Sequence, residues 1–157
     1  MEIEAKFSFR DAAAFETWLG RYRLGPFSLL HPRTIEVSDD YLDSANYACL
    51  RAGYACRLRR HAGGWTATLK SLADVAPGDA SGVRRRDELE VELTTPDSAD
   101  ASADAHGQDV AAWQQPGAWP ESPARDLALR LLQGASLRHL ATLRQERHER
   151  DVRDGVR

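Results

Sequence analysis

The feature of this sequence that most constrains its fold is an alternation of charged and apolar residues with a period of two, which recurs in separate segments. In residues 84–93 one set of alternate positions is entirely charged, and it comprises Arg84, Arg86, Glu88, Glu90 and Glu92. The intervening positions end in Leu89, Val91 and Leu93. Because successive side chains of a β-strand point to opposite faces, the segment is predicted to be a strand with one charged and one apolar face.

The same segregation occurs in residues 1–7, 55–59 and 65–70. The polar positions of these three segments are Glu2, Glu4, Lys6, Arg57, Arg59, Thr66, Thr68 and Lys70. A sheet exposed to solvent tolerates such faces, but a closed or strongly curved sheet with a charged interior explains their recurrence better. The predicted fold class is therefore α+β, an antiparallel β-barrel or tunnel with flanking helices over its apolar outside.

Capping and turn signals place the remaining elements. Asp11 precedes apolar residues at helical spacing, and residues 124–133 form a second helical pattern that ends at Gly134. Further strands are predicted at residues 34–43, 54–61, 64–71 and 137–151, with a short Gly-containing turn between the second and third of these. Residues 44–53 are predicted to be a connector.

Two regions depart from this pattern of strands and helices. Residues 95–122 are rich in Ala, Asp, Ser and Pro, and they are predicted to be a flexible insertion. Asp154-Gly155 is a hairpin turn signal that only two residues follow. We therefore expect the C-terminal strands of the domain to be missing, with open sheet edges that favour pairing with another copy as a homodimer.

Composition excludes several classes of protein. A hydrophobic content of 42% and a charged content of 29% predict one globular domain over residues 1–157. The net charge of −3 argues against a nucleic-acid partner, and no apolar run is long enough for a membrane span. The chain begins with a strand and not a signal peptide, so a cytoplasmic location is expected. Cys49 and Cys56 fit no common metal or redox spacing, and the five histidines have no paired ligand spacing.

Five short motifs occur in one order along the chain. They are ExExK at residues 2–6, YxD at 41–43, RxR at 57–59, TxK at 68–70 and RxExE at 86–90, followed by a basic segment at 138–147. This order resembles the CYTH superfamily, the triphosphate tunnel metalloenzymes. The resemblance covers nearly the whole chain apart from the insertion.

The resemblance implies an eight-stranded antiparallel tunnel that binds a triphosphate and requires Mg²⁺ or Mn²⁺. Family members hydrolyse inorganic triphosphate, thiamine triphosphate or related polyphosphates, act on RNA 5′ ends, or cyclise ATP. We therefore expect a triphosphatase, a hydrolase acting on a phosphoanhydride bond of a small-molecule triphosphate or polyphosphate. About six of the eight strands are predicted here, so whether the shortened chain is active stays open. The basic segment and the insertion look most like bacterial members fused to a helical CHAD domain, which are associated with polyphosphate.

The resemblance also assigns roles to individual residues. The expected metal ligands are Glu2, Glu4, Glu88 and Glu90, which together with Lys6 are the expected catalytic residues. The expected phosphate binders are Lys6, Arg57, Arg59, Lys70, Arg86, Arg144 and Arg147. Tyr41 and Asp43 are expected to orient water or neighbouring basic groups. Elementary chemistry agrees, since Arg and Lys offset phosphate charge, and carboxylates beside them are explained by bridging divalent cations.

Other interpretations of the same residues remain open. Arg57 and Glu88 could form a simple cross-strand ion pair, worth roughly 0.2–1 kcal/mol. The domain could bind polyphosphate or a nucleotide without turnover, or it could be an adenylate cyclase of the class IV type, although no segment specifies a purine pocket. An RNA-binding face is disfavoured because the interleaved carboxylates would repel a phosphate backbone.

Overall fold

The computed structural model describes residues 2–5, 8–61, 64–73, 83–94 and 110–154, and the side chains of residues 2–5 and 83–85 lie outside that description. Its contacts divide the chain into two compact units. The first unit comprises Met1–Ala5 and Ser38–Leu143, and the second comprises Lys6–Val37 and Arg144–Arg157. Each unit is described by itself.

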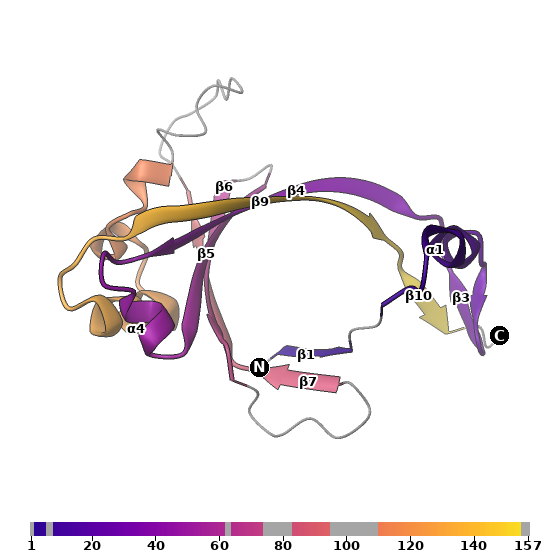
Figure 1. The fold of residues 1–157 in the computed structure, drawn as a ribbon, viewed down its shortest axis with the longest axis horizontal. Coiled ribbons are helices and arrows are strands. Elements are labelled where there is room, and N and C mark those ends of the chain that lie inside the picture. The colour runs from indigo at the N-terminus through magenta and orange to yellow at the C-terminus, as the bar shows by residue number, and fades with distance from the viewer. Residues whose placement is uncertain (1, 6–7, 62–63, 74–82, 95–109, 155–157) are drawn as a thin grey trace. The chain divides into compact units, whose positions relative to one another are not determined.

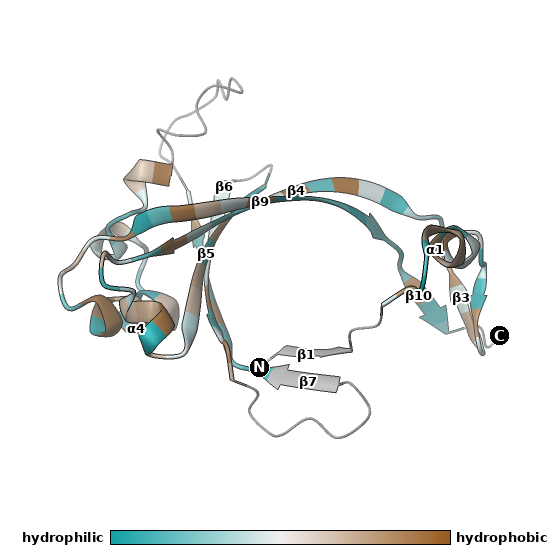
Figure 2. Ribbon diagram, in the orientation of Figure 1, coloured by the Kyte–Doolittle hydropathy of each residue, from teal (hydrophilic) through white to brown (hydrophobic). Residues whose placement is uncertain are grey.

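A five-stranded sheet with the strand order β8-β6-β5-β4-β9 forms the centre of the first unit (Figure 1). Its strands are β8 (Glu88–Leu93), β6 (Gly64–Ser71), β5 (Tyr54–His61), β4 (Arg33–Asp43) and β9 (Arg138–Glu149). The boundary between the units falls within β4 and β9. A separate antiparallel pair joins β1 (Glu2–Ala5) to β7 (Val83–Arg86). Figure 2 shows hydrophilic and hydrophobic residues alternating along part of β4.

The antiparallel hairpin of β5 and β6 sets the register of the sheet. Both strands have the predicted bounds, and His61 pairs with Gly64 at the turn. Gly64 has φ +138°, and a Cβ atom there would lie 2.7 Å from the carbonyl oxygen of Leu93 on β8. A glycine is therefore required where β6 passes the end of β8.

The apolar face of this sheet packs against short helices. Leu42, Cys56, Leu58, Ala67, Leu69 and Leu93 are buried on it. Helices α2 (Ala48–Arg51) and α4 (Pro123–Leu132) contribute Cys49, Ala124, Leu127, Ala128 and Leu132 to the same core. Ser122 caps α4 by accepting a hydrogen bond from the Arg125 amide at 3.1 Å. The opposite face of the sheet is left to polar side chains.

Part of the expected flexible insertion belongs to this core. Residues 95–109 lie outside the described residues, but Val110, Trp113 and Trp119 are buried in the same cluster, on either side of the 3₁₀-helix η2 (Pro116–Ala118). The indole Nε1 of Trp119 donates a hydrogen bond to the Trp113 carbonyl oxygen at 3.0 Å. The prediction of a flexible insertion rested on the Ala- and Pro-rich composition and gave no weight to the two Trp residues. Burial of each indole ring removes a large apolar area from water.

The second unit contains a helix and a small sheet that the sequence analysis predicted only in part. Helix α1 (Ala12–Leu19) is capped as expected by Asp11, which accepts a hydrogen bond from the Ala14 amide at 2.8 Å. Strands β2 (Arg23–Leu24), β3 (Phe27–Leu29) and β10 (Val152–Asp154) form a sheet with the order β10-β3-β2. Gly25, with φ +58°, lies in the turn between β2 and β3, a hairpin that was not predicted.

The predicted fold class is confirmed. The protein is α+β, its paired strands are antiparallel, and in the described residues no sheet closes on itself, since the central sheet begins at β8 and ends at β9. The described strands outnumber the six that were predicted, because β2, β3 and β10 were missed and Asp87 separates β7 from β8. No helix in the described part of the chain combines the length and apolar character that a bilayer crossing requires.

The burial of Trp119 predicts that residues 110–119 stabilise the fold. Replacing Trp119 by Ala should lower the free energy of unfolding by about 3–5 kcal/mol, because the substitution leaves a large cavity in the core. Urea denaturation would measure the change. The control is Leu129→Ala on the exposed side of α4, for which a loss under about 1 kcal/mol is expected. Equal, small effects of both substitutions would contradict the packing described here.

Candidate functional site

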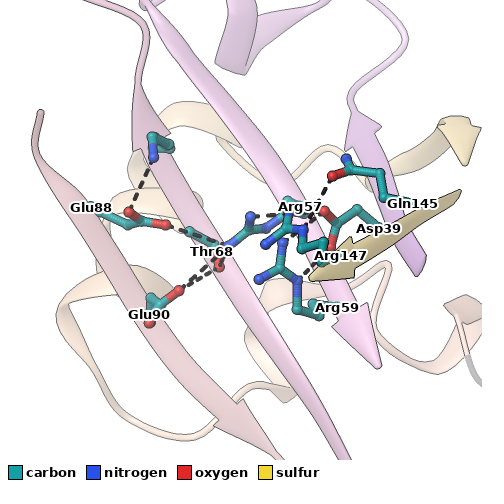
Figure 3. Close-up of polar contacts among 9 residues, drawn as sticks. Asp39, Arg57, Arg59, Thr68, Glu88, Glu90, Gln145 and Arg147 are labelled. Atoms are coloured by element: carbon teal, nitrogen blue, oxygen red, sulfur yellow. Dashed lines mark hydrogen bonds and ion pairs between the residues drawn. The ribbon is translucent and has the colours of Figure 1, made fainter. Parts of the chain in front are cut away.

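Strand register brings the polar positions of four strands together on one face of the central sheet. Residues directly opposite each other in an antiparallel pair point to the same side. The register pairs Asp39 with Arg59, Arg57 with Thr68, Thr68 with Glu90, and Lys70 with Glu88. Figure 3 shows the side chains of Asp39, Arg57, Arg59, Thr68, Glu88 and Glu90 close together, and Lys70 joins them through its contact with Glu88. We call these seven residues the polar cluster.

Arg57 lies at the centre of the polar cluster. Its Nη2 donates a hydrogen bond to the Thr68 hydroxyl at 3.0 Å and lies 3.4 Å from Glu88 Oε1 and 3.5 Å from Glu90 Oε1. The Thr68 hydroxyl in turn donates to Glu90 Oε1 at 3.0 Å. Among the described residues, the buried Nε of Arg57 has no hydrogen-bond partner. A buried donor of this kind is costly unless an acceptor arrives, so Arg57 retains capacity for a further ligand.

The two glutamates of the polar cluster have different environments. The Glu88 side chain is 14% exposed and also contacts Lys70, whose Nζ lies 3.3 Å from Glu88 Oε2. The Glu90 side chain is 52% exposed. Glu88 is thus held between two cations in a partly desolvated position, where charge pairs are stronger than at an open surface.

Asp39 completes the polar cluster on β4, and the sequence analysis did not select it. Its side chain is 1% exposed, and its two carboxylate oxygens accept hydrogen bonds from Arg59 Nε at 2.7 Å and Arg59 Nη2 at 2.8 Å. This hydrogen bonding raises the pKa of Arg59, against the opposing effect of partial burial. Asp39 Oδ2 also lies 3.9 Å from Arg57 Nη1. The period-two pattern could have found it, because Asp39 shares a face with Tyr41 of the YxD motif.

The polar cluster contains both signs of charge in equal number among its described residues. Its three cations are Arg57, Arg59 and Lys70, and its three anions are Asp39, Glu88 and Glu90. Each charge is therefore compensated by a neighbour, as charges withdrawn from water require. When an anion and a cation arrive together, the Arg and Lys side chains of such a cluster can pair with the anion and its carboxylates can pair with the cation.

Five of the predicted site residues are brought together here: Arg57, Arg59, Lys70, Glu88 and Glu90. Glu2 and Glu4 lie on β1, where their backbone positions pair with Arg86 and Arg84 of β7. The side chains of Glu2 and Glu4, and all of Lys6, lie outside the described residues. The roles assigned to these three residues stay predictions.

Arg144 and Arg147 belong to the second unit. Arg144 is exposed on β9. Arg147 Nε donates a hydrogen bond to Gln145 Oε1 at 3.2 Å, so these two side chains lie on the same side of the strand. Their predicted role as phosphate binders stays a prediction.

Asp43 of the YxD motif caps a helix. Its Oδ1 accepts hydrogen bonds from the amides of Ser44 at 2.7 Å and Cys49 at 2.9 Å, and its Oδ2 accepts one from the Leu50 amide at 2.9 Å. The carboxylate therefore satisfies backbone donors of α2 and of the turn before it. The expectation that Asp43 orients water or basic groups is not what this geometry shows, because both of its oxygens are engaged by the backbone.

The donor chemistry of the polar cluster fits a hard divalent cation. Glu88 and Glu90 lie two positions apart on one face of β8 and offer carboxylate oxygens, the ligands that Mg²⁺ and Mn²⁺ prefer. The described residues contain no group of three or more His, Cys, Asp or Glu side chains placed to hold a metal ion. A complete ligand set would therefore need carboxylates from the undescribed side chains, such as those of Glu2 and Glu4.

The two cysteines lie behind the site, in the core on the apolar face. Burial, with the charge of Asp43 and a hydrogen bond to it, raises the pKa of Cys49 from 9.0 to about 12. Burial, followed by the charges of Cys49 and Asp43, also raises the pKa of Cys56. Both thiols are free and buried. They are thus kept in the protonated, unreactive form.

Comparison with known families decides what kind of domain carries this site. A family model described as the CYTH domain matches residues 1–157. The chain belongs to the CYTH family. This confirms the resemblance drawn from the five motifs, and CYTH proteins are typically phosphoryl-transfer enzymes that depend on a metal ion. In the other two comparisons, no curated protein and no solved structure matches this CYTH chain.

The capping geometry predicts a purely structural role for Asp43. Asp43→Ala would leave three backbone amides without their acceptor and should lower the free energy of unfolding by about 3 kcal/mol. At a temperature where the variant is folded, its affinity for tripolyphosphate should stay within about twofold of the parent, because the carboxylate faces α2. Urea denaturation and calorimetry would measure the two effects. Asp126→Ala, in the exposed first turn of α4, is the control, with an expected loss of about 0.3–1 kcal/mol. Weakened binding at unchanged stability would contradict the assignment.

The raised thiol pKa values predict a specific dependence of stability on pH. The unfolded chain releases its thiol protons near the ordinary value of 9.0, before the folded chain does. Stability from the buried thiols is therefore fully present below that pH, and it is lost as pH rises toward about 12, the folded pKa of Cys49. Urea denaturation at pH 8 and pH 10 should show a steeper loss for the parent chain than for the Cys49→Ala, Cys56→Ala double variant. Parallel losses in the two proteins would show that the thiols do not contribute.

Proposed function

We propose that this protein hydrolyses the terminal phosphate of inorganic triphosphate or of a related organic triphosphate, such as thiamine triphosphate, with Mg²⁺ or Mn²⁺. The observation that carries the proposal is the joined arrangement of Arg57 and Lys70 with Glu88 and Glu90 on one face of the sheet of a CYTH domain. Basic side chains alone would suit a bare anion, and carboxylates alone would suit a bare cation. Both kinds of side chain in contact suit an anion that binds together with a metal ion.

The cationic side chains of the polar cluster are suited to bind and orient the phosphates. Arg57 and Arg59 carry planar guanidinium groups that can each donate two hydrogen bonds to one phosphate, and Lys70 supplies a compact charge. In the structure these groups are paired with Glu88, Glu90 and Asp39. A phosphate that replaces a glutamate as the partner of Arg57 keeps that cation compensated, so the exchange does not require charges to be exposed.

The proposed metal ligands are Glu88 and Glu90, with Glu2 and Glu4 of β1. When bound there, a divalent cation would offset phosphate charge and polarise a phosphoryl oxygen. Glu88 and Glu90 would hold this cation through their carboxylates, and Arg57 and Lys70 would bind the phosphates of the substrate. Arg57 and Lys70 stabilise the negative charge that develops on the leaving diphosphate, as fixed donors do most effectively in a partly desolvated site.

The remaining site residues complete the proposal. Lys6, Arg86, Arg144 and Arg147 are proposed to bind further phosphate oxygens, on the basis of the family motifs. Glu92 is excluded from the set: it is the next residue on the same face of β8, but its exposed carboxylate accepts a hydrogen bond from Thr66 at 2.9 Å and lies 2.9 Å from His61 Nε2. This arrangement makes Glu92 a matched control for Glu88.

Phosphate release from tripolyphosphate tests the proposed function. The parent chain should release phosphate only when Mg²⁺ or Mn²⁺ is present, and Glu88→Gln should lower the rate by about 100-fold or more, because it removes a charge that holds the metal. Glu92→Gln should change the rate by less than about threefold, since its contacts are on the exposed rim. Thermal unfolding of both variants would check that they are folded.

Absence of turnover would contradict triphosphate hydrolysis, and a separate outcome would contradict the role of Glu88. If the folded parent chain shows no metal-dependent release, calorimetry with tripolyphosphate would then show whether the chain is a binding module. Binding that needs no metal and is indifferent to Glu88→Gln would identify a simple anion trap. Equal losses in Glu88→Gln and Glu92→Gln would indicate a general charge effect in place of a metal ligand.

A further inference from the structure

The most completely buried charge of the polar cluster is one that the family motifs do not include. The Asp39 side chain is 1% exposed, and it lies on β4 directly opposite Arg59 in the register. Its two oxygens accept hydrogen bonds from the Nε and Nη2 of Arg59, and one oxygen also lies 3.9 Å from Arg57 Nη1 (Figure 3). A buried carboxylate in contact with two guanidinium groups needs an explanation, because it reduces the positive charge available to an anionic ligand.

The geometry determines which donors of Arg59 remain available. A guanidinium group has five N–H donors, and the pairing with Asp39 engages the edge formed by Nε and Nη2. The Nη1 group and the second hydrogen of Nη2 are left on the outer end of the group. The Arg59 side chain is 26% exposed, so the outer end can be reached while the inner edge is held.

We propose that Asp39 is a positioning residue, which holds the guanidinium of Arg59, and through its second contact that of Arg57, in the orientation that receives phosphate oxygens. This inference rests on the proposed function and adds a residue to that site. Asp39 does not touch the substrate in this arrangement. It acts by holding two long side chains in place before the ligand arrives, so that binding costs less of their conformational entropy.

The alternative is that Asp39 acts only as a negative charge near the ligand. The two roles predict changes of opposite sign. Removing a nearby negative charge should strengthen the binding of an anion by Coulomb's law. Removing a positioning group should weaken the binding, because Arg59 then loses its fixed orientation and the asparagine amide would oppose one of its N–H groups.

The first experiment is therefore calorimetry of Asp39→Asn with tripolyphosphate in the presence of Mg²⁺. We expect the dissociation constant to rise by about tenfold, as is typical when a group that orients a binding side chain is lost. The matched control is Asp40→Asn. Asp40 is the adjacent residue, equally buried, but its side chain meets Thr142 and His139 behind the sheet. The control should cost stability yet leave the dissociation constant within about twofold.

A double-variant cycle shows whether Asp39 acts through Arg59. In an Arg59→Lys background, which lacks the planar fork, Asp39→Asn should have a much smaller effect, under about threefold, because only the longer contact with Arg57 is left to lose. An unchanged or lowered dissociation constant for Asp39→Asn in the parent background would overturn the proposal. So would an equal tenfold loss in both backgrounds, which would place the effect elsewhere.

A measurement on the unaltered chain covers the case in which Asp39→Asn does not fold. The Nε–H signal of Arg59 in a ¹⁵N spectrum should exchange slowly with water in the ligand-free protein, and it should remain protected when tripolyphosphate binds. Loss of that protection on binding would show that Arg59 leaves Asp39 for the phosphate, and it would overturn the positioning role. Failure of the parent chain to bind tripolyphosphate would instead refute the proposed function, while slow exchange without ligand would still report the contact between Asp39 and Arg59.

Discussion

The described structure depends on one electrostatic constraint: charges that leave bulk water must find partners of opposite sign nearby. The central sheet meets it by placing both signs on one face. Arg57 contacts Thr68, Glu88 and Glu90 across two neighbouring strands, and the buried carboxylate of Asp39 holds Arg59. The apolar face is thereby free to pack against α2, α4 and the indole rings of residues 110–119.

Much of this arrangement could be predicted from the sequence, because alternate residues of a β-strand lie on the same face of the sheet. The alternation in residues 54–61 and 64–71 gave both strands of the hairpin with their observed bounds, and it placed Arg57 and Lys70 on the same face. The short turn leaves little freedom in the register, so the residues opposite each other follow once the bounds are known. The family resemblance then assigns site roles to five of the residues that meet in the polar cluster.

The parts that could not be predicted depend on contacts between segments distant in the sequence. Asp39 precedes the YxD motif, and its importance becomes visible only when the register places it opposite Arg59. Asp43 is an alternate position of the same strand as Asp39, but its carboxylate accepts hydrogen bonds from the amides of a helix that begins five residues later. The segment around Trp113 and Trp119 has the composition of a loop, and its burial depends on packing with α4 and the apolar face of the sheet in one core. The hairpin at Gly25 was missed because a Gly-Pro pair is as compatible with the end of a helical segment as with a turn between two strands.

The balance of charge in the polar cluster has a consequence for how a ligand reaches it. Opposite charges a few ångströms apart produce a field that decays quickly with distance, and salt screens what remains beyond about 10 Å. The described charges of this face therefore provide little long-range attraction for an anion diffusing in solution. The described charges therefore act on a ligand only once it is in contact with the site, where its shape and coordination determine whether it binds. Their contribution to the association rate should be nearly independent of ionic strength.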